Sequence, residues 1–226
     1  TTGSNNVAIG YLALSTEDAH GRNVAIGRQA LKDQDAGIDA YNIAIGYNAG
    51  MSMSTGAYNT LIGGSAGDAL TTGVNNIAIG YGALSSEDGH GRNVAIGTSA
   101  LYALNAGADA YNVAIGNQAG YAVTTGVQNT IVGGMAGDAM TTGNQSVFVG
   151  YSAGSATVDG TENIAIGSNA LLTNVDGSKS TAIGTSALRN QEPASATDMY
   201  NIAVGHNAGY AVSTGVQNTL IGGLAG

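Results

Sequence analysis

Charged side chains, cysteine, tryptophan and proline are scarce or absent in this chain of 226 residues. Only 9% of the residues are charged, against roughly 25% in an average soluble domain. There is no cysteine or tryptophan, and Pro193 is the only proline. The lack of cysteine excludes disulfides and thiolate metal sites. Six Lys and Arg residues against fifteen Asp and Glu cannot form a basic, phosphate-binding surface, so we expect no nucleic-acid partner.

Long apolar runs are also missing. None approaches the roughly 20 residues of a membrane-spanning helix, and no signal peptide is recognisable. The eleven Tyr and one Phe leave little aromatic surface for stacking on sugars. The chain begins at Thr1 and ends at Gly226 in the middle of a repeated pattern, so we expect a segment of a longer protein.

Glycine, in contrast, is abundant, and one glycine recurs on a nearly fixed period. Most spacings are 17 residues, and the exceptions are 19 and 21. Ile or Val always precedes this repeat glycine, Ala always stands three residues after it, and Asn or Ser stands four before it. The repeat glycines are Gly10, Gly27, Gly46, Gly63, Gly80, Gly97, Gly116, Gly133, Gly150, Gly167, Gly184, Gly205 and Gly222.

A longer period groups these units into blocks 1–70, 71–140 and 141–226 of one repetitive segment. Residues 1–70 and 71–140 align without gaps, and the third block holds five units instead of four. The longest unit of each block comes just before Tyr41, Tyr111 or Tyr200, so we expect one bulging loop per block. Pro193 lies in the largest of these, where no ladder hydrogen bond is needed.

A unit of about 17 residues is too short for helix-pair repeats, and it lacks helical periodicity. β-branched residues before each glycine and turn formers around it predict an all-β solenoid, a parallel β-roll with one unit per coil. We expect two short strands and two turns per coil, with thirteen coils giving a rod about 60 Å long.

The strand pattern N-V-A-I-G is apolar on both faces, which is typical of a strand buried on both sides. We expect neighbouring parallel chains to cover one face, with the small Ala permitting close approach. The repeated Asn residues predict ladders from coil to coil. The repeat glycine and the Ala after it predict places where a larger side chain would collide with a neighbour.

Ser152 is the strongest candidate nucleophile, because Gly150-Tyr151-Ser152-Ala153-Gly154 matches G-x-S-x-G after a strand-like run. The flanking Gly150 and Ala153, however, belong to the repeat, and no helix pattern follows. The position of Ser152 is variable, and holds Leu, Gln, Asn, Gly or Met in other units. We therefore expect no catalytic role for Ser152.

The three histidines offer two further candidate sites, a triad with Ser152 and a divalent-cation site. His20 and His90 occupy equivalent acidic loops, and His206 follows a repeat glycine. Carboxylates beside a histidine could bind a cation, but the spacing matches no specific metal motif. A solvated turn explains these loops better. The two candidate cation sets are Glu17, Asp18 and His20, and Glu87, Asp88 and His90.

The remaining motif matches fail on spacing. Gly63–Asp68 and Gly133–Asp138 differ from the calcium-binding nonapeptide, and Lys179 lies outside a phosphate-binding loop pattern. We expect no catalytic, cofactor-binding or metal-binding residues and no cofactor. Phe148, where most units have Ala, predicts a local widening of the packing around a buried ring.

Stretches such as NNVAIGYLAL, YNIAIGYNAG and TTGVQNTLIGG resemble the shaft repeats of bacteriophage tail fibres. They are also similar to the head repeats of YadA-like trimeric autotransporter adhesins, although those usually repeat at a shorter period. The resemblance covers essentially the whole chain. It implies a left-handed β-roll that assembles as a homotrimer, and the period of 17 favours the tail-fibre type.

The resemblance implies a non-enzymatic fibre segment that displays a host-recognition tip, located on a virion appendage outside the cell. Its partners would be two further copies of itself and a host-surface glycan or protein. The alternative is the head of a bacterial trimeric adhesin, located on the bacterial cell surface. A carbohydrate-active hydrolase using Ser152 or the acidic loops is a more remote alternative.

Overall fold

The computed structural model describes residues 3–17 and 20–226, which form a parallel β-solenoid with about 17 residues in each of about 13 turns. The chain divides into two compact units, Thr1–Tyr111 and Asn112–Gly226. No helix occurs in the described part of the chain, and so none that could cross a membrane. The all-β solenoid with one repeat unit per coil is therefore confirmed.

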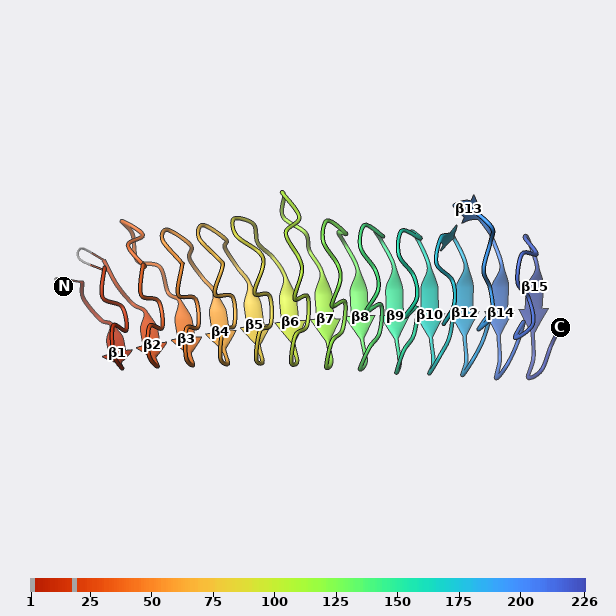
Figure 1. Ribbon diagram of the computed structural model, residues 1–226, viewed down its shortest axis with the longest axis horizontal. Helices are drawn as coiled ribbons and strands as arrows, with labels where there is room; N and C mark the ends of the chain where they lie inside the picture. The colour runs from red at the N-terminus through yellow and green to blue at the C-terminus, as the bar shows by residue number, and fades with distance from the viewer. Residues whose placement is uncertain (1–2, 18–19) are drawn as a thin grey trace. The chain divides into compact units, whose positions relative to one another are not determined.

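Each coil contributes one strand of three residues to a parallel sheet, and consecutive coils pair in register (Figure 1). The first unit contains β1 (Val7–Ile9), β2 (Val24–Ile26), β3 (Ile43–Ile45), β4 (Thr60–Ile62), β5 (Ile77–Ile79) and β6 (Val94–Ile96). The second contains β7 (Val113–Ile115), β8 (Thr130–Val132), β9 (Val147–Val149), β10 (Ile164–Ile166), β12 (Thr181–Ile183), β14 (Ile202–Val204) and β15 (Thr219–Ile221).

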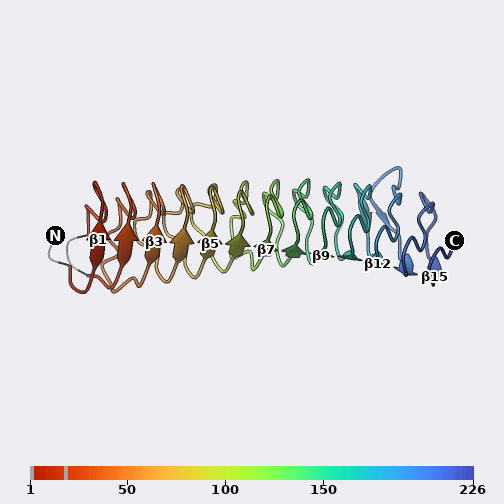
Figure 2. The same ribbon diagram turned by 90° about the horizontal axis from the view of Figure 1, so that it is seen from below.

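The expectation of a second strand in each coil is wrong for nearly every coil, because most coils contain one strand. Figure 2 shows a strand on one side of each coil and turns on the other. The reason is backbone conformation: five residues before, two after and four after the repeat glycine, φ is positive, as at Arg22 (62°), Gln29 (60°) and Leu31 (47°). A β-strand cannot continue through residues in the left-handed backbone conformation. Backbone hydrogen bonds still join the coils on this side, such as the one from Gln29 N–H to Tyr11 O at 2.8 Å.

Two short extra strands occur in the second unit, where the longest repeat unit forms its loop. β11 (Gly177–Ser178) pairs in parallel with β13 (Thr197–Asp198), and Figure 1 shows β13 extending beyond the neighbouring turns. Pro193 lies just before β13 and outside any strand. The expectation that this proline needs no ladder hydrogen bond is confirmed.

The middle residue of each strand points into the coil's own interior. Ala25, Ala44 and Leu61 in the first unit are fully buried, and so are Ala114 and Phe148 in the second. The expectation that another chain covers this Ala face is therefore wrong, because the turns of the same coil cover it. The face left open carries the β-branched residues that flank the middle residue, such as Ile43 and Ile77, each 38% exposed.

In most coils the middle strand residue and a turn residue fill the interior in complementary ways. Where the middle strand residue is Ala, the position four after the repeat glycine is usually a buried Leu, as with Ala78 and Leu84. Where the middle residue is Leu, Ile or Phe, that position is Gly, as with Phe148 and Gly154. A Cβ on Gly154 would lie 2.7 Å from the Phe148 ring, so the small residue is what admits the large one.

Phe148 is fully buried inside its coil, as the sequence suggested. Its ring packs over Gly154 of its own coil and Gly137 of the preceding coil, so the two glycines provide the volume that the ring needs. Compensation by small neighbours therefore explains how the coils accommodate the ring.

Candidate functional site

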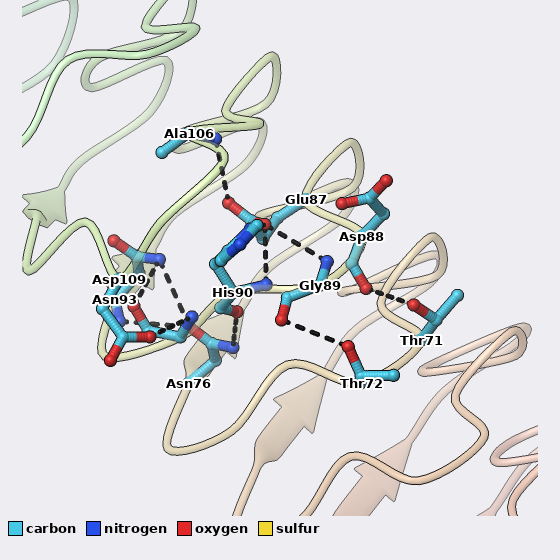
Figure 3. A network of polar contacts seen from close by, with 11 residues as sticks. Thr71, Thr72, Asn76, Glu87, Asp88, Gly89, His90, Asn93, Ala106 and Asp109 are labelled. Carbon is cyan, nitrogen blue, oxygen red and sulfur yellow. Dashed lines mark hydrogen bonds and ion pairs between the residues drawn. The ribbon is translucent and has the colours of Figure 1, made fainter.

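The acidic loop at Glu87, Asp88 and His90 is the one cluster in the described residues that could offer three ligands to a metal ion. One potential ligand atom from each residue lies within 4.8 Å of the others. The loop follows the β5 strand and its turn, and Figure 3 shows its side chains together with those of the neighbouring coils.

Glu87 is completely buried, and its carboxylate already accepts backbone hydrogen bonds (Figure 3). Oε1 accepts from the N–H of His90 at 3.0 Å and of Gly89 at 3.4 Å. Oε2 accepts from Ala106 N–H of the next coil at 3.4 Å. The expectation of a solvated turn is therefore wrong for Glu87, because burial beside several amide donors makes this carboxylate the organiser of the turn.

The rest of the loop is held by its backbone. The carbonyl of Asp88 accepts from both the N–H and the hydroxyl of Thr71, each at 2.6 Å. The carbonyl of Gly89 accepts from the Thr72 hydroxyl at 3.2 Å. The Asp88 side chain is exposed. A cation bound here would have to displace the amide donors from Glu87, so we assign this loop no metal.

Glu17 plays the same part in the first block. Its Oε1 accepts from His20 N–H at 3.0 Å, its Oε2 accepts from the Asn23 amide at 3.3 Å, and its side chain is buried. Asp18, the third member of this candidate set, lies outside the described residues. Glu17 and Glu87 share their position, seven after a repeat glycine, with the buried Gln34 and Gln191. That shared position was the signal that these acids belong to the interior.

The Asn ladder predicted from the repeat is confirmed, and it bridges backbones. The Oδ1 of Asn42 accepts from Asn59 N–H at 2.9 Å, and its Nδ2 donates to Gly56 O at 2.7 Å. Asn59 repeats both bonds with Asn76 and Gly73. Because these amides are buried, each ladder position satisfies backbone groups that water cannot reach.

Three surface clusters recur once per block, and the sequence analysis did not identify them. Each joins a cation, an aspartate and a tyrosine in the slots beside the long loop. The cation–carboxylate distance is 2.7 Å in all three. The clusters are Arg22 with Asp39 and Tyr41, Arg92 with Asp109 and Tyr111, and Lys179 with Asp198 and Tyr200.

In the third cluster the hydrogen bond between the side chains shifts both titrations. It raises the pKa of Lys179 above its ordinary value and lowers the pKa of Asp198. Lys179 is thus engaged by the carboxylate of Asp198. The recurrent DAY and DMY sequences before the repeat Asn were the sequence feature that could have indicated these three clusters.

Ser152 lies in the turn after β9 and its residue is only 6% exposed. Its backbone has a φ of 52°, its N–H donates to Gly134 O at 3.0 Å, and no helix follows. Within residues 3–17 and 20–226, its hydroxyl makes no hydrogen bond to a histidine or a carboxylate. This geometry lacks the base and the helix that a nucleophile elbow requires.

Comparison with models of known families, with curated proteins and with solved structures gave no match to this chain.

Proposed function

We propose that this chain is a structural, non-enzymatic segment of an extracellular fibre, with a phage tail fibre as the leading assignment. In this proposal three parallel chains form a left-handed homotrimeric rod that holds a host-recognition tip away from the particle. The head of a bacterial trimeric adhesin, on a cell surface, is the alternative, because the same coils would serve there.

The observation that carries the proposal is the uncovered apolar face of the strands. In every coil, the residues one and three before the repeat glycine are β-branched. In the first unit Ile43 and Ile77 are each 38% exposed, and in the second Ile183 and Ile202 are 37% and 42% exposed. Contiguous exposed apolar surface of this kind marks an interaction surface in soluble proteins.

A copy of the same chain fits this face by its chemistry. The outer face is β-branched in every strand and carries no charged residue, so identical coils present identical rows of mostly apolar residues to one another. Thr interrupts these rows at Thr60, Thr130, Thr181 and Thr219. The buried Asn ladder and the backbone bonds between coils make each unit a regular support for such a row. A repetitive surface of this kind suits mechanical work better than one chemical reaction.

The mass of the purified chain in solution tests the assembly. Light scattering should give three times the chain mass of 22.2 kDa. A mass equal to one chain would overturn the homotrimer.

Immunogold labelling then tests the biological role. We expect an antibody against this chain to label appendages of phage particles in electron micrographs. Labelling of bacterial surfaces instead would support the adhesin alternative.

A further inference from the structure

A polar pocket opens on the surface of the first unit, across three consecutive coils that carry β4, β5 and β6. Its cavity volume is about 240 Å³. Tyr81 and Tyr102 bring aromatic rings to it, and Gly82 lies between them in the lining. The remaining lining residues are Ser65, Asp68, Ser85 and Ser86.

Gly82 is what leaves this space open. It lies two residues after a repeat glycine, at a position where all the other coils have a residue with a side chain. Its φ of 62° is close to that of Gln29 (60°) and Leu12 (55°), so backbone conformation alone does not require glycine there. A Cβ on Gly82 would lie 3.5 Å from the Tyr102 ring, within the lining of the pocket.

The equivalent place 70 residues later, in the second unit, carries larger side chains at the positions of Ser65 and Gly82. Ser65 is replaced there by Met135, Gly82 by Ser152 and Tyr102 by Leu172. The Tyr151 hydroxyl contacts the Met135 sulfur at 3.6 Å. The carboxylate equivalent to Asp68 is also engaged, because Ser155 donates its hydroxyl to Asp138 at 2.6 Å. With Ser86, which is replaced by Ala156, four of the seven lining residues thus differ between the two places on the same backbone.

The lining combines groups of two kinds. Three serine hydroxyls can each donate and accept a hydrogen bond, and the Asp68 carboxylate can accept several. Tyr81 is 68% exposed and so presents ring surface to solvent. Burial raises the pKa of Asp68, while a hydrogen bond from Ser65 opposes that shift. A half-buried carboxylate gains most from a ligand that donates hydrogen bonds to it.

We propose that this pocket binds one pyranose unit of a glycan, with a sugar face against the Tyr rings and sugar hydroxyls bonded to Asp68 and the serines. Ring faces suit the C–H surface of a sugar, and alternating donors and acceptors suit its hydroxyls. Two of the chain's eleven tyrosines line this pocket. This inference is independent of the proposed fibre role.

An organic cation is the competing ligand chemistry. Cation sites are typically built from several aromatic faces around the charge. Here three hydroxyls and one carboxylate outnumber the two rings in the lining. Tyr11, Arg28 and Tyr47 each follow a repeat glycine, and the Arg28 guanidinium lies 5.8 and 5.4 Å from the centroids of the two Tyr rings. Tyr81 has the same position in its coil, but its neighbours there are Gly64 and Thr98, so no cationic side chain lies in these slots. The hydroxyl-rich lining favours the sugar.

Saturation-transfer NMR and calorimetry on the full chain, with glucose, galactose, mannose, N-acetylglucosamine and choline as probes, test the proposal. We expect at least one sugar to bind more tightly than choline. Gly82→Asn should weaken the affinity for that sugar at least about tenfold, because the Asn side chain would fill the pocket. Asn suits the backbone, since Asn48 holds the same slot with a φ of 56°. Tyr102→Leu introduces the residue found at the equivalent position, Leu172, and should weaken the affinity similarly.

Ser152→Asn is the control, because it places the same residue in the equivalent slot of the second unit and should leave binding unchanged. Circular dichroism and thermal unfolding confirm that each variant folds. Failure of every sugar to bind the wild-type chain would overturn the proposal. Tighter binding of choline than of any sugar, or sugar binding unaffected by both Gly82→Asn and Tyr102→Leu, would overturn it equally.

Discussion

At the scale of single residues, the repeat glycine shows how sequence regularity arises from close approach. Its φ lies between 126° and 142° in all coils, and successive coils bring these backbones together. In the first unit, a Cβ on Gly80 would collide with the carbonyl of Gly97. The slot is therefore restricted to glycine both by conformation and by space.

Gly80→Ala should lower the free energy of unfolding by about 3 kcal/mol or more, because it adds a backbone clash to a strained φ. Gly107→Ala is the control, since Gly107 also has a positive φ, of 69°, but has nothing within 4 Å of its Cβ position. Urea unfolding of both variants measures the difference. Equal losses in the two would contradict the role of close approach.

Asp68 should make stability depend on pH in a known direction. Burial raises its folded pKa above the ordinary value of 3.8, so the folded state holds the proton more firmly than the unfolded state. Its contribution is fully present below pH 3.8 and is lost as pH rises through the raised folded pKa. The stability of wild type relative to Asp68→Asn, from urea unfolding, should therefore be smaller at pH 7 than at pH 3. A difference that grows with pH would contradict this sign.

At the scale of elements, strand and turn residues fill the interior of a coil together. A turn Leu packs over a strand Ala in some coils, and a large strand residue packs over a turn Gly in others. A third set combines a strand Ala with a turn Gly, at Ala44, Ala114 and Ala203. The third block replaces the pair Ala78 and Leu84 by Phe148 and Gly154 at the equivalent positions. The two positions are therefore coupled through a shared volume.

The pair Ala78→Phe and Leu84→Gly should show this coupling in a double-mutant cycle. Leu84→Gly alone leaves a cavity and should cost about 3–5 kcal/mol, and Ala78→Phe alone overpacks the coil. Together they recreate the packing of β9, so the double variant should be at least about 1 kcal/mol more stable than the sum of the single losses predicts. Additive losses in chemical unfolding would rule this out.

The loop after β5 depends on one buried carboxylate. Glu87→Ala should lower the free energy of unfolding by about 1–3 kcal/mol, because it leaves the amides of Gly89, His90 and Ala106 without their acceptor. Glu87→Gln should cost less, since Gln34 occupies the same slot. Thermal unfolding would compare the two, and a larger loss for Gln than for Ala would contradict the acceptor role.

At the scale of the whole molecule, we expect the outer strand face to govern the proposed self-association. Ile77→Lys places a charge in the apolar row and should reduce the mass measured by light scattering from three chains toward one. Ile38→Lys is the matched control, because Ile38 is 53% exposed in a loop away from the strands. If both variants keep the wild-type mass, the strand face is not the interface.

The recurrent motif positions show how much of the candidate sites could be predicted. The repeat alone explains the Gly and Ala that flank Ser152, because stacking places both residues in every coil. It also placed the Asn ladder correctly, since one amide per coil has an equivalent in the next. The buried state of Glu87 and the pocket at Gly82 could not be read this way, because both depend on which side chains from neighbouring coils meet.

The sequence by itself determined the solenoid, its period and the stacking of equivalent residues, because a period fixes which positions lie above one another. Only the tertiary structure decided which face of the strand is buried. An apolar run such as V-A-I has no polar alternation to mark an inside, and the left-handed turn residues that fold each coil over the Ala are not evident from their side chains. That decision leaves the β-branched face, with residues such as Ile43 and Ile77, open to solvent.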